Sequence, residues 1–201
     1  MRVKRSCVVV SVVLAFLLVP LAQVSASTPI SIGTNGVIPE RALVRLGDAA
    51  RWMNDDSRPH RIVSSPEGFF QTDRMPPGTS EAVVFISAGS FPYSTGAASG
   101  VVGVVSVPVG LRPGPNTVPT PGATITIRVA IKGCSDCTYD VQRKRNNGPW
   151  VTIAQDTSAI TVEFQPHRMG YFWFRARVTD TSADITSKWS VPRVKLVAPP
   201  P

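Results

Sequence analysis

The stretch FPYSTGAASGVVGVVSV, residues 91–107, decides the fold class of the first half of the chain. It predicts a β-strand, a turn of five small residues from Gly96 to Gly100, and a second strand. Similar short runs with β-branched alternation recur along the chain, separated by clusters of Gly, Pro, Asn and Asp. Because no segment after the N-terminal apolar run has a sustained helical period, we expect an all-β protein built from sandwiches.

The N-terminal stretch MRVKRSCVVVSVVLAFLLVPLAQVSAS combines three positive charges, an apolar run and a motif of small residues, Val24-Ser25-Ala26. This order is typical of a secretory signal peptide over residues 1–26. An uncleaved membrane anchor is the alternative, but the apolar run from Cys7 to Ala22 is shorter than the roughly 20 residues that a span needs. We therefore expect a secreted or extracytoplasmic protein of the cell envelope, without a stable membrane span after cleavage.

A segment rich in proline and glycine, PVGLRPGPNTVPTPG at residues 108–122, divides the remaining chain. This composition predicts a semi-stiff linker over residues 109–121 that carries neither a strand ladder nor a helix. The linker separates a domain at residues 28–108 from a domain at residues 122–198, and each has the length of one β-sandwich.

Two cysteines, Cys134 and Cys137, follow the predicted signal peptide in the motif CSDC. In an oxidising compartment they are candidates for a local disulfide. The alternative is a redox-active thiol pair. Such a pair normally needs a helix N-terminus to lower the thiol pKa, whereas the segment TYDVQRKR that follows the motif alternates like a strand. Two cysteines without nearby histidines also cannot complete a closed zinc site.

Several spaced motifs characterise the first domain: RLGDAARWMNDDSRPH, MPPGTS, VVFISAGSFPY and the closing strand GVVSV. The cupredoxin-like domain at residues 28–108 resembles the cupredoxin family through these motifs over nearly all of residues 40–107, specifically the small blue copper domains of the plastocyanin and amicyanin type. The resemblance implies a Greek-key β-sandwich. It also implies a type 1 copper site, in which two histidines, one cysteine thiolate and a weak axial methionine hold the metal.

Three of the four ligand positions implied by this resemblance are changed. His60 occupies the position of the first histidine, whereas Thr95 stands for the cysteine, Ala98 for the second histidine and Val101 for the methionine. A threonine hydroxyl does not ionise near neutral pH, so no cofactor is expected. His60 is either a weak metal ligand or, as we favour, a partly exposed loop residue bonded to backbone. The turn of small residues is either a flat docking face or only a hairpin tip.

The second domain carries two long motifs, CTYDVQRKRNNGPWVTIAQDTSAITVEF and GYFWFRARVTDTSADITSKWSVPRVKLV. Residues 122–198 resemble a fibronectin type III or related immunoglobulin-like sandwich through them. The residues themselves predict a hairpin at Asn147-Gly148. They also predict a strand with one apolar face and one face of aromatic and cationic side chains, the latter formed by Tyr171, Trp173, Arg175 and Arg177.

Two groups of cations in this domain are candidates for a binding surface. The first is the face of Trp173, Arg175 and Arg177, which either binds a polymer or is a structural ladder of stacked side chains. The second is the run Arg143, Lys144 and Arg145, which either contacts phosphate-bearing polymers or protects an edge strand from aggregation.

Enzyme motifs are lacking, because the chain has two histidines and no nucleophile elbow, zinc-protease motif or phosphate loop. Nothing in the sequence suggests base stacking or groove reading, so no nucleic-acid partner is expected. We expect a non-enzymatic binding or scaffolding protein whose partner is an unknown protein or an anionic cell-envelope polymer. The alternative is a periplasmic or extracellular electron-transfer protein that binds copper through other residues. The net charge of +8 includes three cations of the predicted signal peptide.

Overall fold

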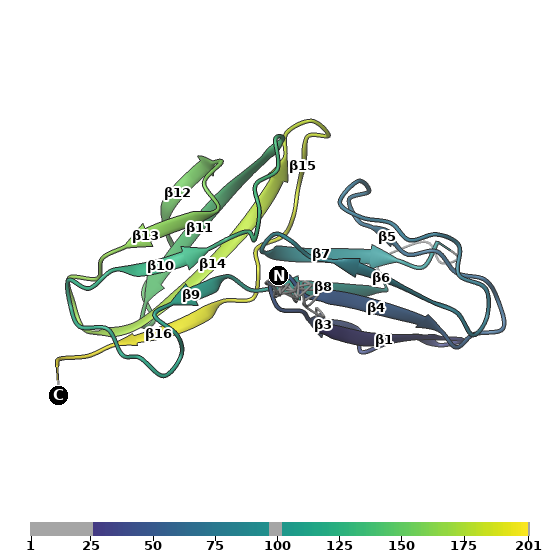
Figure 1. The fold of residues 1–201 in the computed structure, drawn as a ribbon, viewed down its shortest axis with the longest axis horizontal. Helices are drawn as coiled ribbons and strands as arrows, with labels where there is room; N and C mark the ends of the chain where they lie inside the picture. Colours follow the sequence, from purple (N-terminus) through teal and green to yellow (C-terminus); the bar gives the residue numbers. More distant parts are fainter. Residues whose placement is uncertain (1–25, 97–101, 201) are drawn as a thin grey trace, which may run out of the picture.

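The computed structural model describes residues 26–96 and 102–200, and these residues form strands, turns and loops without a helix (Figure 1). The expected all-β class is therefore confirmed. The signal peptide predicted for residues 1–26 falls outside the described residues except for Ala26. No helix of the described part is long and apolar enough to cross a membrane.

The first sandwich, drawn on the right in Figure 1, consists of two four-stranded sheets. One sheet has the order β2-β1-β4-β6, with β1 and β4 parallel and the other neighbours antiparallel. Its strands are β1 (Ser27–Gly33), β2 (Gly36–Ile38), β4 (Ala49–Asn54) and β6 (Ser80–Val84). Alternate residues of β4 are buried, as expected for a strand with one face on a core.

The second sheet of this sandwich has the order β3-β8-β7-β5. Its strands are β3 (Arg41–Leu43), β5 (Val63–Ser64), β7 (Gly89–Ser94) and β8 (Gly103–Val107). The two strands predicted within residues 91–107 are confirmed, because β7 and β8 pair antiparallel with Phe91 opposite Val105. The turn predicted between them, Gly96 to Gly100, lies outside the described residues except for Gly96. The core between the sheets centres on Trp52, which is fully buried and packs edge-to-face on Tyr93 at 5.5 Å.

The second sandwich has a three-stranded sheet of order β13-β10-β9 facing a five-stranded sheet. In the larger sheet, β11 lies between β12 and β14, and β14 also pairs with β15 and β16. The bounds are β9 (Gly110–Arg112), β10 (Ile125–Arg128), β11 (Cys137–Arg145), β12 (Val151–Thr157), β13 (Thr161–Phe164), β14 (Gly170–Asp180), β15 (Ile185–Thr186) and β16 (Arg193–Val197). The hairpin predicted at Asn147-Gly148 connects β11 to β12.

The expectation that residues 109–121 carry no strand is wrong. Residues 110–112 form β9, which pairs antiparallel with β10 and places Leu111 opposite Ile127. β9 lies at the edge of its sheet, where neighbouring prolines cost little because one side of the strand needs no partner. The following loop is fixed as well, since the buried Lys195 donates a hydrogen bond to the carbonyl of Gly114.

The two sandwiches meet along residues 86–90, which include the first two residues of β7. Four backbone hydrogen bonds cross this junction: Ala88 N to Val129 O (2.7 Å), Ile131 N to Ile86 O (3.0 Å), Ser90 N to Lys188 O (2.9 Å) and Lys188 N to Ser90 O (3.0 Å). The hydroxyls of Ser87 and Tyr139 also lie 3.3 Å apart across it. The sandwiches are therefore docked through their backbones and not only tethered by the chain.

Candidate functional site

His60 lies in a loop of the first sandwich, where its backbone exchanges two hydrogen bonds with Met75. The ring is buried, with 7% of the residue exposed, and its Nε2 lies 2.8 Å from Oδ2 of Asp56. The expectation of a partly exposed side chain bonded to backbone is therefore wrong. Asp56 is four residues away, and only the curl of the loop brings its carboxylate against the ring.

Asn54 holds this loop in shape from the end of β4. Its side-chain nitrogen donates to the carbonyls of Arg58 (2.8 Å) and Met75 (2.9 Å), and its Oδ1 accepts from the amide of Asp56 (3.1 Å). The side chain is fully buried, so these bonds replace lost water contacts. The hydrogen bond from His60 is the largest cause that lowers the pKa of Asp56.

The other ring nitrogen of His60, Nδ1, is buried and has no hydrogen-bond partner. Because a carboxylate only accepts hydrogen bonds, Nε2 donates to Asp56, and Nδ1 is the ring nitrogen left for another partner. A carboxylate that orients an imidazole in this way is common behind metal-binding histidines. Thr95 is also buried and lines the same two surface hollows as His60. The degenerate ligand positions Ala98 and Val101 lie outside the described residues.

The residues present do not fit a type 1 copper ion. Such an ion needs a thiolate and two imidazoles, and Thr95 supplies an alcohol where the thiolate would stand. Within the part of the chain that the structure describes, no group of three or more His, Cys, Asp or Glu side chains is arranged to hold a metal. His60 Nδ1 is one nitrogen donor, which is too little to define a metal centre.

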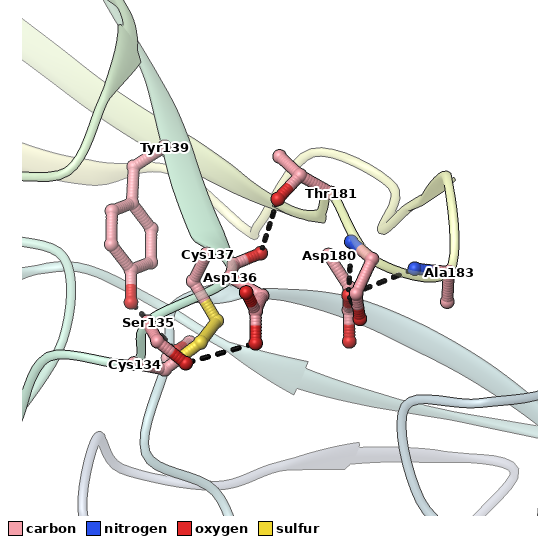
Figure 2. The surroundings of a disulfide bond; sticks show 10 residues. Cys134, Ser135, Asp136, Cys137, Tyr139, Asp180, Thr181 and Ala183 are labelled. Atoms are coloured by element: carbon pink, nitrogen blue, oxygen red, sulfur yellow. Dashed lines mark hydrogen bonds between the residues drawn. A yellow bond between two sulfur atoms is a disulfide. The ribbon is translucent and has the colours of Figure 1, made fainter.

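Cys134 and Cys137 form a disulfide in the second sandwich (Figure 2). Cys137 begins β11, so a strand and not a helix follows the CSDC motif, as predicted. The carbonyl of Asp136, inside the motif, accepts hydrogen bonds from the amide and hydroxyl of Thr181. The disulfide thus closes a short loop against the end of β14, and neither cysteine keeps a free thiol.

The outward face of β14 carries a ladder of cations and aromatic rings, as the alternation predicted. The guanidinium of Arg175 lies 4.1 Å from the ring centre of Trp150 and 4.7 Å from that of Trp189. Arg177 also lies over the ring of Trp189, at 4.7 Å, and forms an ion pair with Asp140 at 2.7 Å. Burial lowers the pKa of Arg175, and the charge of Arg177 contributes to the same shift.

Lys144 extends this ladder, with its Nζ 5.2 Å from the ring centre of Trp150 and 5.5 Å from that of Trp173. We call Lys144, Trp150, Trp173, Arg175, Arg177 and Trp189 the cation–aromatic ladder. The sequence did not identify Trp150 and Trp189 as members, because they lie outside β14 and join it only through folding. Trp150 follows the turn between β11 and β12, and this position beside the hairpin is the sequence feature that could have indicated its place in the ladder.

The run Arg143, Lys144 and Arg145 is divided by the sheet, because successive side chains of a strand point to opposite faces. Lys144 joins the ladder, whereas Arg143 lies over the ring of Phe164 at 5.5 Å. Arg145 donates from its Nε to the carbonyl of Met169 at 2.9 Å. The three cations therefore do not form one continuous basic surface.

Comparison of the sequence with protein-family models and with curated proteins gives no match. Among solved structures, a novel purple cupredoxin from Nitrosopumilus maritimus is 25% identical with a TM-score of 0.37, and the match covers 39% of this chain and 97% of that chain. A Cu(I) amicyanin variant is 21% identical with a TM-score of 0.35, covering 40% and 81%. A chain of a cytokine receptor complex is 14% identical with a TM-score of 0.34, covering 70% and 86%.

Proposed function

We propose that the protein is an exported, non-enzymatic binding protein, and that the cation–aromatic ladder binds an anionic polymer of the cell envelope. The observation that carries this proposal is the charge of the ladder face. Three cations, Lys144, Arg175 and Arg177, lie there against one carboxylate, that of Asp140. A polymer with regularly spaced negative charges complements such a row.

The stacking supports binding because it fixes the cations before a partner arrives. Side chains of arginine and lysine lose rotamer entropy when a partner immobilises them, and rings that already hold them reduce this cost. Lys144 is the cation most available to a partner, since within the described residues Arg177 pairs with Asp140 and Arg175 donates two hydrogen bonds to Gln142, whereas Lys144 makes neither kind of contact.

Chromatography on immobilised dextran sulfate, with neutral dextran as the comparison, tests this proposal. We expect retention on dextran sulfate alone, with elution by salt because screening weakens contacts between exposed charges. Lys144→Gln is expected to elute at lower salt than the unchanged protein. The matched control is Lys132→Gln, which removes the same charge from an exposed loop of the same sandwich.

An equal shift for both lysine variants would contradict the proposal, because net charge alone would then explain retention. Elution of the unchanged protein at the same salt as the Lys144→Gln variant would contradict it as well. Circular dichroism of each variant confirms that the sandwiches remain folded.

Under this proposal the first sandwich is a scaffold without bound copper, which the alcohol of Thr95 at the thiolate position supports. We expect a colourless protein that purifies without stoichiometric copper, as measured by elemental analysis and visible absorption. An intense blue band after copper addition, or tight one-to-one copper, would reject this part of the proposal.

A copper-binding electron-transfer protein is the second candidate, and one observation favours it. His60 presents a buried, unpartnered Nδ1 while Asp56 holds the other side of the ring. If this candidate is correct, copper titration gives a one-to-one complex that is lost in His60→Gln and kept in His167→Gln. No such difference is expected for a copper-free scaffold.

A further inference from the structure

A cavity of about 160 Å³ lies where the two sandwiches meet, and it includes neither His60 nor a residue of the cation–aromatic ladder. The first sandwich contributes its aromatic wall, which consists of Phe69, Phe70, Phe85 and Phe91. Three of the ring pairs in this wall pack edge-to-face, with centres 5.2 to 6.5 Å apart. Because the rings support one another, the wall keeps its shape without a ligand.

The second sandwich supplies the opposite wall. The Cys134–Cys137 disulfide and Val178 form its apolar part, and Asp180 adds a carboxylate. Cys137 and Asp180 lie directly opposite one another on β11 and β14, as Figure 2 shows. Neither sandwich alone has the complete cavity, and the backbone hydrogen bonds across the junction keep the two walls together.

The loop before the phenylalanines passes close to the second sandwich at Gly68. A Cβ built on this residue would lie 2.8 Å from Cδ1 of Ile185, and its φ of +121° is one that side-chain-bearing residues rarely adopt. A glycine is therefore needed for Phe69 and Phe70 to reach their places in the wall.

The size and lining of the cavity indicate one aromatic ring. An apolar cavity of about 150 Å³ in another protein stays dry and binds benzene. Ligand pockets between domains are typically apolar with a few polar groups that orient the ligand. Here the polar side chains of the lining are those of Ser87 and Asp180.

One oxygen of Asp180 remains available to a ligand. Its Oδ1 accepts hydrogen bonds from the hydroxyl and amide of Ser182 and from the amide of Ala183, at 2.7 to 3.1 Å. Oδ2 accepts none among the described residues. These bonds hold the carboxylate at the edge of the cavity.

We propose that the interdomain cavity binds a small molecule with a single aromatic ring and a positively charged amino group. The ring lies among the four phenylalanines, and the ammonium group faces Oδ2 of Asp180. This site is independent of the polymer-binding face proposed above, so either proposal can fail without the other.

Calorimetric titration of the purified protein with benzylamine, benzyl alcohol and benzoate tests both parts of the proposal. Benzylamine is expected to bind about tenfold more tightly than benzoate, a difference of about 1.4 kcal/mol, with benzyl alcohol between them. Asp180→Asn keeps an Oδ1 acceptor for the bonds from Ser182 and Ala183 but removes the charge. In this variant benzylamine is expected to bind no better than benzyl alcohol.

Two variants fill the cavity from opposite sides, Val83→Phe in the first sandwich and Val178→Phe in the second. Both are expected to lose binding of all three probes, whereas Val151→Phe, on the exposed β12, keeps it. Thermal unfolding identifies a filling variant that fails to fold. In that case the binding measured with the other filling variant tests the site. Absence of benzylamine binding, or binding that survives filling, would overturn the site. Equal affinity for the three probes would overturn the assigned charge.

Discussion

At the scale of single residues, Gly103 has no room for a side chain in the first sandwich. A Cβ on this residue would lie 2.4 Å from the hydroxyl oxygen of Tyr93, whose side chain is fully buried. Burial also raises the pKa of Tyr93. The start of β8 and the ring of Tyr93 therefore occupy neighbouring space that allows no extra methyl group.

We predict that Gly103→Ala destabilises the protein by about 1–3 kcal/mol, the usual cost of overpacking a core. Urea unfolding measures the change. Gly133→Ala is the matched control, because a Cβ there meets nothing within 4 Å, and its effect is expected within about 0.5 kcal/mol. Equal stability of the two variants would show that Tyr93 can move aside.

A second prediction at this scale concerns Asp180. The Ser182 hydroxyl is the largest cause that holds its pKa below the ordinary value of 3.8. This bond stabilises the folded state fully above that value, and its contribution is lost as the pH falls through the lower folded pKa. Ser182→Ala should therefore be less stable than the unchanged protein at neutral pH, and the difference should shrink in acid. Ser158→Ala, an exposed control, should show no such convergence in denaturant unfolding at each pH.

At the scale of elements, the cation–aromatic ladder joins two strands, β11 and β14, with two loop segments. Arg175 comes from β14, its hydrogen-bond acceptor Gln142 from β11, and the two indoles from the residue just before β12 and from the segment between β15 and β16. A guanidinium is flat and stacks on both sides, which an ammonium group does not reproduce.

We predict that Arg175→Lys lowers the free energy of unfolding by about 1–2 kcal/mol, since two cation–π contacts contribute about 0.5–1 kcal/mol each. The tryptophan fluorescence should shift to the red as the indoles become more hydrated. Arg193→Lys, at the exposed start of β16, should change neither quantity. An unchanged free energy of unfolding in Arg175→Lys would mean that the stacking contributes nothing to stability.

At the scale of the whole molecule, Gly89 lies where the two sandwiches meet and has no room for a side chain. A Cβ there would lie 2.6 Å from Oγ of Ser187 and 2.9 Å from the ring of Phe91. The buried apolar residues of both sandwiches also form one continuous cluster. We therefore predict a single cooperative thermal transition for the protein.

Gly89→Ala should separate this transition into two, because it forces the junction apart while each sandwich retains its own core. Differential scanning calorimetry measures the number of transitions. Gly114→Ala, whose Cβ meets nothing within 4 Å, should preserve the single transition. Two transitions in the unchanged protein would show that the junction is too weak to couple the sandwiches.

Local patterns in the sequence were sufficient for the all-β class, for the hairpin at Asn147-Gly148 and for the two faces of β14. Alternation and turn residues act between neighbours in the chain, so they can be read without the fold. β9 was missed because proline-rich composition hid a short edge strand. The environment of His60 was missed because its burial depends on Asn54 and Met75, which act through loop packing.

The sequence alone therefore determined that this is an all-β protein, that the first sandwich lacks a thiolate at Thr95, and that β14 has one cationic and aromatic face. Only the tertiary structure decided which partners those residues have: Asp56 for His60, Trp150 and Trp189 for Arg175, and a cavity between the sandwiches for Asp180. The physical reason is the distance along the chain over which each feature acts. Side-chain periodicity is a property of adjacent residues, whereas burial, stacking and cavities arise from contacts between segments far apart in the chain.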